Sequence, residues 1–139
     1  MQDLIVLFSG RFDRPHIGHI RTLQMLGQEY KKVIVPVLMG ENDRYDICER
    51  VRMLAEICSD MPGDFVIYPN RHHFAKVTQK ELESYGDFDV YASGNRKCID
   101  HIRNIDAFVY PKCEVLLRFI PRSFDISATE EYERGANAD

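Results

Sequence analysis

Two histidines, His16 and His19, lie three residues apart near the start of the 139-residue chain, shortly after an apolar run that ends in Ser-Gly. Residues at this spacing share one face of a helix, and Pro15 suits a position where a helix begins. Backbone N–H groups at a helix start attract phosphate, and imidazole N–H groups beside them can stabilise a phosphoryl group during transfer. We therefore interpret this segment as a site for phosphate chemistry; an ordinary polar helix start is the alternative.

Two glycines near these histidines suit a bulky anionic ligand. Gly10 would allow the backbone to approach the ligand, and Gly18 would leave room between the histidines for a triphosphate. Attack on an α-phosphorus atom requires charge neutralisation on its oxygens and on the departing pyrophosphate. Imidazole donors can supply this without covalent chemistry.

The elements that must position these residues alternate between strands and helices. Apolar runs predict strands, listed in chain order: 3–8, 33–39, 65–68, 88–93 and 114–120. Helical spacing predicts the helices 17–30, 47–59, 76–85, 97–104 and one from Ser127 onward. Pro36 favours an edge position or an irregularity in its strand, and residues 70–74 are expected to form a loop. This α/β pattern predicts one Rossmann-like, doubly wound parallel sheet of about five strands flanked by helices, with ligands at the carboxyl ends of the strands.

Composition limits the class of protein. The length and 45% hydrophobic content fit one domain over residues 1–139, with a polar tail at about 135–139. A formal net charge of -4 argues against a nucleic-acid partner. The first apolar run is too short for a signal peptide or a membrane span, and the four cysteines are widely spaced, so we expect a cytoplasmic protein with reduced thiols.

Two motifs resemble those of the HIGH-motif nucleotidyltransferases. The pattern G-x-F-D-x-x-H-x-G-H is matched by Gly10, Phe12, Asp13, His16, Gly18 and His19. The second pattern, I-S-x-T, is matched by Ile126 to Thr129. Pro121-Arg122-Ser123, shortly before it, resembles the version found in glycerol-3-phosphate cytidylyltransferase. The resemblance implies an enzyme that transfers a nucleoside monophosphate from a nucleoside triphosphate to a phosphorylated small molecule, with Mg²⁺ carried by the triphosphate and not by protein ligands.

The resemblance also implies roles for individual residues. His16, His19 and Arg122 would act on the reacting phosphate. The residues expected to contact the nucleotide are Gly10, Phe12, Asp13, Gly18, Arg50, Gly94, Asn95, Ser127 and Thr129, with Ser127 and Thr129 holding the β- and γ-phosphates. Arg44 would replace a lysine that grips the triphosphate in relatives. After Thr129 the sequence reads Glu130-Glu131-Tyr132 where relatives carry a cation, and Arg134 is the candidate substitute.

The substrates and the assembly stay open. CTP with a polyol, sugar or choline phosphate is slightly favoured, and ATP with nicotinamide mononucleotide or phosphopantetheine is the alternative. A nucleotide-binding regulatory module without catalysis is the alternative from another class, supported by Glu130-Glu131-Tyr132. The resemblance suggests a homodimer. His101 and the pair His72 and His73 match no motif, although that pair could lie near the acceptor.

Overall fold

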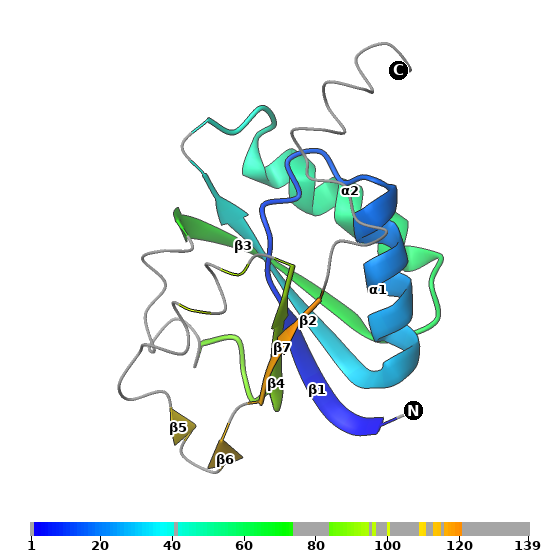
Figure 1. The fold of residues 1–139 in the computed structure, drawn as a ribbon. Coiled ribbons are helices and arrows are strands. Elements are labelled where there is room, and N and C mark those ends of the chain that lie inside the picture. Colours follow the sequence, from blue (N-terminus) through cyan, green and yellow to red (C-terminus); the bar gives the residue numbers. More distant parts are fainter. Residues whose placement is uncertain are drawn as a thin grey trace.

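The computed structural model describes residues 2–40, 42–73, 84–94, 96, 100, 109–110, 113–114 and 116–120. These residues contain a five-stranded sheet with the strand order β3-β2-β1-β4-β7 (Figure 1). The strands are β1 (Gln2–Phe8), β2 (Tyr30–Met39), β3 (Phe65–His73), β4 (Val90–Ser93) and β7 (Leu116–Phe119). Every neighbouring pair in this sheet is parallel, which confirms the predicted doubly wound α/β architecture.

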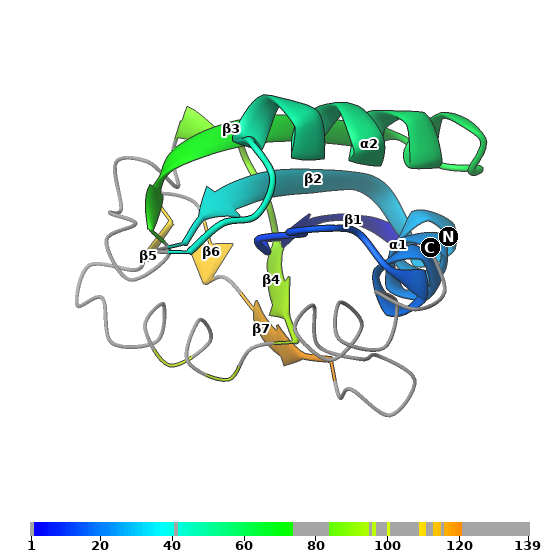
Figure 2. The same ribbon diagram turned by 90° about the horizontal axis from the view of Figure 1, so that it is seen from above.

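Two helices of the described part cover one face of the sheet. They are α1 (Ile17–Glu29) and α2 (Ile47–Ser59), whose bounds the apolar spacing predicted to within one residue. α1 packs against β2, and α2 packs against β2 and β3 (Figure 2). Leu23 and Leu26 of α1 and Leu54 of α2 share one core cluster with Val33 and Val35 of β2. Neither helix is long and apolar enough to cross a membrane, and the same holds throughout the described residues.

Pro36 lies in an interior strand, so the expectation of an edge position was wrong. β2 is flanked by β1 and β3, and Pro36 pairs with Tyr68 of β3. The proline is tolerated because the regular pairing of β2 with β1 ends at Leu7 and Ile34, before Pro36 is reached. Beyond that point, the backbone N–H of Gly10 donates to the carbonyl of Pro36 over 3.3 Å. The expected irregularity is present, as a shift in the β2–β3 register between Val37 and Met39.

Other bounds differ from the prediction. β3 continues through residues 70–73, which were expected to form a loop. Residues 113–114 belong to a separate antiparallel pair, formed by β5 (Val109–Tyr110) and β6 (Cys113–Glu114), so the last sheet strand is shorter than expected. The helices expected over 76–85, over 97–104 and from Ser127 onward lie largely or wholly outside the described residues.

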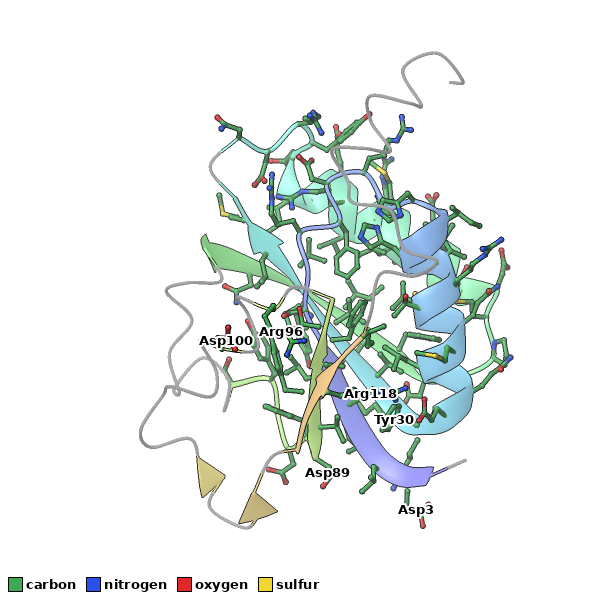
Figure 3. The ribbon with its side chains drawn as sticks, viewed as in Figure 1. Asp3, Tyr30, Asp89, Arg96, Asp100 and Arg118 are labelled. Atoms are coloured by element: carbon green, nitrogen blue, oxygen red, sulfur yellow. The ribbon has the colours of Figure 1, made fainter. Side chains whose placement is uncertain are left out.

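An ion pair ties the edge strand β7 to the helical layer. Arg118 of β7 donates to the carboxylate of Glu29 over 2.8 Å and to the hydroxyl of Tyr30 over 2.9 Å. Figure 3 shows Arg118 and Tyr30 side by side where α1 ends and β2 begins. These contacts connect the last turn of α1, whose other end carries the two histidines, to the edge strand β7.

Candidate functional site

The loop after β1 folds back toward β2 at the carboxyl edge of the sheet. The backbone N–H of Leu38 donates to the carbonyl of Gly10 over 2.8 Å, which continues the pairing past the end of β1. A Cβ atom at position 10 would lie 3.0 Å from the ring of Phe12, so a larger residue here would push against that ring. Phe12 and Arg14 have φ angles of 47° and 69°, in the left-handed region that side chains other than glycine rarely adopt. Surrounding contacts must therefore hold the loop in this conformation.

The buried ring of Phe12 packs against His19 on the side that faces the sheet core. Its side chain is buried, and its ring meets the rings of Phe8 and His19 edge to face, with centroid distances of 5.8 Å and 4.8 Å. The ring thereby links the sheet core to the first turn of α1. The sequence pattern placed Phe12 among the nucleotide-binding residues. In the structure its side chain is buried in the core, in contact with His19.

His16 and His19 cap α1 through a reciprocal pair of hydrogen bonds. The Nδ1 atom of His16 accepts from the backbone N–H of Gly18 over 3.1 Å, and Nδ1 of His19 accepts from the backbone N–H of His16 over 3.2 Å. The two rings stack with centroids 3.7 Å apart and planes 19° apart. An imidazole nitrogen that accepts a hydrogen bond carries no proton, so each neutral ring carries its N–H on Nε2. The helix start thus sets the tautomer of both rings as well as their spacing.

Asp13 joins the loop after β1 to the loop after β2. Its carboxylate is buried and accepts from the backbone N–H groups of Arg44 over 2.7 Å and of Tyr45 over 2.9 Å. The guanidinium of Arg11 lies 3.5 Å away. Both carboxylate oxygens therefore have partners in the protein, and the charge is compensated without a metal ion. Arg44 itself is exposed beside this contact.

Arg50 of α2 holds three backbone segments together. Its side chain is 1% exposed and donates to the carbonyls of Tyr45, Arg11 and Leu38 over 3.0, 2.6 and 2.8 Å. It also donates to the carboxylate of Asp43 over 3.0 Å. These bonds use four of the five N–H donors of a guanidinium. The resemblance placed Arg50 on the phosphates, whereas its contacts in the structure stabilise the loops around the histidines.

Arg11 and Asp43 form the part of the site that sequence reasoning missed. The Oδ1 atom of Asp43 accepts from Nε and Nη2 of Arg11 over 3.1 Å and 2.9 Å. Its Oδ2 atom accepts from the backbone N–H of Gly40 over 2.9 Å and from Arg50. The one sequence signal was the turn-like stretch from Gly40 to Asp46, in which aspartate commonly binds nearby backbone N–H groups. The pairing of Asp43 with Arg11, which lies 32 positions earlier, cannot be inferred from the residues around either position.

The remaining expected site residues divide into two groups. Gly18 is buried in the first turn of α1, and Gly94 is half-buried directly after β4. The others lie outside the described residues and stay predictions: Asn95, Arg122, Ser127, Thr129 and Arg134.

Within the described ranges, no three histidine, cysteine, aspartate or glutamate side chains gather as a metal site would require. Because both oxygens of Asp13 already accept backbone N–H groups, this carboxylate is poorly suited to bind a cation directly.

Known proteins share this sequence pattern and this fold. The profile of the cytidylyltransferase-like family matches residues 7–130. The phosphopantetheine adenylyltransferase of Natranaerobius thermophilus is 31% identical over 124 residues, which cover 80% of this chain and 76% of that protein. The nicotinamide-nucleotide adenylyltransferase of Sulfurisphaera tokodaii is 28% identical over 107 residues, covering 70% of this chain and 62% of that protein.

A solved structure supports the fold. The bifunctional NMN adenylyltransferase/ADP ribose pyrophosphatase from Francisella tularensis matches all of this chain with a TM-score of 0.71 and 20% identity. This chain spans 43% of the length of that protein. The match over residues 7–130 includes the loop after β1 and both capping histidines. The chain is therefore a nucleotidyltransferase that belongs to the cytidylyltransferase-like family.

Proposed function

We propose that this protein transfers AMP from ATP to the phosphate group of a small phosphomonoester and releases pyrophosphate. The observation that carries this proposal is the stacked pair His16 and His19, whose Nδ1 atoms are engaged at the start of α1. The sequence alone slightly favoured CTP with a polyol, sugar or choline phosphate. The two relatives described above are both adenylyltransferases, so they support the alternative, ATP.

The proposed chemistry is an in-line displacement. A phosphate oxygen of the acceptor attacks the α-phosphorus of ATP, a new phosphorus–oxygen bond forms, and the bond to the pyrophosphate leaving group breaks. The Nε2–H groups of His16 and His19 donate to oxygens on which negative charge increases in the transition state. The N-terminus of α1 adds its partial positive charge. Neither ring forms a covalent bond, so the reaction depends on positioning and charge stabilisation.

Arginines and a metal ion complete the proposed site. Arg11 lies in the loop after β1 with its side chain partly exposed, and we propose that it binds a phosphate of one substrate. Arg122, Ser127 and Thr129 keep the roles that the family resemblance implies, on the reacting phosphate and on the leaving pyrophosphate. Mg²⁺, carried by the triphosphate, would supply further charge neutralisation.

Two acceptors follow from the relatives. Phosphopantetheine and nicotinamide mononucleotide are the acceptors named for the bacterial and the archaeal relative, and each presents a terminal phosphate. We propose that one of these two, or a close analogue, is the acceptor. We further propose that the protein acts in the cytoplasm, as a homodimer.

A pyrophosphate-release assay tests the proposal. The protein is incubated with Mg²⁺, with ATP or CTP, and with each acceptor or with glycerol 3-phosphate. The expected result is pyrophosphate release with ATP together with phosphopantetheine or nicotinamide mononucleotide. Release with CTP and glycerol 3-phosphate alone would contradict the choice of nucleotide. Thermal stabilisation by ATP without release for any acceptor would instead indicate a binding module without catalysis.

A further inference from the structure

We infer that Asp43 is a positioning residue that holds the guanidinium of Arg11 at the phosphate site, an inference that rests on the proposed function. Its carboxylate receives four hydrogen bonds from three parts of the chain. Two come from Arg11, on the loop after β1. The others come from the backbone of Gly40 after β2 and from Arg50 of α2. Asp43 is therefore the point at which these three segments meet.

The contacts of Arg11 fix one edge of its guanidinium. Nε and Nη2 donate to the same oxygen of Asp43, and Nη2 also lies 3.5 Å from Asp13. The side chain remains 43% exposed, so a ligand can reach it from solvent. The edge that carries Nη1 lies on the other side of the planar group. That edge can donate to a substrate phosphate while Asp43 keeps the group in place.

The space beside Gly40 is occupied by the Arg11–Asp43 pair. A Cβ atom at position 40 would collide with the Arg11 guanidinium and lie 2.9 Å from Oδ1 of Asp43. Glycine at this position therefore leaves room for the pair, while the Asp43 carboxylate is what holds the guanidinium.

The charges in this cluster balance, so Arg11 must bind an anion through direct hydrogen bonds. The guanidinium groups of Arg11 and Arg50 face two carboxylates, Asp43 and Asp13. Asp13 also accepts two backbone N–H groups. The attraction of Arg11 for a phosphate therefore depends on the N–H groups of its outer edge. The phosphate that it meets belongs either to ATP or to the acceptor.

A double-mutant cycle with Asp43→Asn and Arg11→Gln tests this inference. If Asp43 acts through Arg11, Asp43→Asn raises KM for ATP or for the acceptor roughly tenfold, with a much smaller change in kcat. The same substitution in the Arg11→Gln background then leaves that KM unchanged. The substrate whose KM responds identifies the phosphate that Arg11 holds. Asp46→Asn is the matched control, because Asp46 lies in the same loop and its carboxylate caps α2 by accepting from the backbone N–H of Cys48.

The melting temperature separates positioning from structure. Asp43→Asn also weakens the bond to buried Arg50, and this loss of stability persists in the Arg11→Gln background. An equal rise in KM in both backgrounds would overturn the inference, since Asp43 would then act through Arg50 alone. If Asp43→Asn does not fold, Gly40→Ala is used, because its methyl group crowds both Arg11 and Oδ1 of Asp43 and so disrupts their pairing without removing either charge. An unchanged KM in that variant would equally overturn the inference.

Failure of the proposed function can be recognised separately. If the unmodified protein releases no pyrophosphate with either acceptor, the proposed reaction is wrong. The same cycle is then measured by calorimetry with ATP and with inorganic tripolyphosphate. Coupling between Asp43 and Arg11 in the affinity for either probe would support the positioning role. Affinities that change independently would overturn it.

Discussion

The Nδ1 atom of His19 accepts a hydrogen bond from the backbone N–H of His16, and the two imidazole rings stack 3.7 Å apart. The bond belongs to a capping box in which histidines replace the usual serine and glutamate. One set of contacts therefore starts the helix and also prepares the donors that the proposed reaction needs. A substitution that keeps the cap of α1 but removes the imidazole N–H donor can therefore separate the effect on stability from the effect on catalysis.

His16→Asn separates capping from donation. Asparagine is among the best N-cap residues, so the free energy of unfolding should change little. Its short amide cannot reproduce the Nε2–H of the imidazole, so kcat for pyrophosphate release should fall about 100-fold or more. KM for ATP should change far less. Steady-state kinetics and urea denaturation provide the two readouts, and an unchanged kcat would remove His16 from the mechanism.

Arg50→Lys tests the buried guanidinium. Lysine keeps the charge but cannot reach three carbonyls and a carboxylate in the same geometry, so buried acceptors lose their partners. The free energy of unfolding should fall by about 3 kcal/mol. Arg52→Lys, at an exposed position of the same helix, is the control and should change it by less than about 0.5 kcal/mol. Equal effects in urea denaturation would contradict this role.

Asp13→Asn tests the connection between the two loops. One carboxylate oxygen becomes an NH₂ group that faces a backbone N–H of Arg44 or Tyr45. Two donors then face each other in a buried place, so the protein should lose about 1–3 kcal/mol of stability. Asp46→Asn should be close to neutral, because asparagine caps a helix nearly as well as aspartate. Thermal denaturation of both variants distinguishes the outcomes; a fully stable Asp13→Asn variant would show that the loops are joined by other contacts.

Two cysteines of α2 should react at very different rates. Burial raises the pKa of the Cys58 thiol to about 11, whereas Cys48 is exposed. At pH 8 the folded protein therefore holds Cys58 as an unreactive thiol. Because the pKa in the folded state lies above that of the unfolded chain, the unfolded thiol ionises first, and the stability of the folded state falls as pH rises from about 9 toward 11. Iodoacetamide followed by peptide mass spectrometry should show Cys48 modified and Cys58 protected; equal labelling would contradict the burial of Cys58.

The sequence predicted the elements whose signals are local. The apolar run of β1, the spacing of α1 and the two histidines lie within one short stretch, so the strand, the helix and the pair at its start could be inferred together. That His16 lies at the N-cap and bonds reciprocally with the first turn was not predicted. For Pro36 the sequence left an edge position and an irregularity as alternatives, and the irregularity is the one present. Which strands flank β2 depends on long-range pairing that no residue near Pro36 reveals. The contacts of Arg50 and the pairing of Arg11 with Asp43 join three loops, and only the folded chain brings those loops together.

The tautomer of the two imidazoles is the most direct test of the central claim. Long-range ¹H–¹⁵N NMR of the histidine rings distinguishes a proton on Nε2 from one on Nδ1, and can be repeated with a non-hydrolysable ATP analogue and Mg²⁺. We expect His16 and His19 both to be protonated at Nε2, and the analogue to shift the Nε2–H signals of both rings. A proton on Nδ1 in either neutral ring, or Nε2–H signals that do not respond to the nucleotide, would contradict that claim.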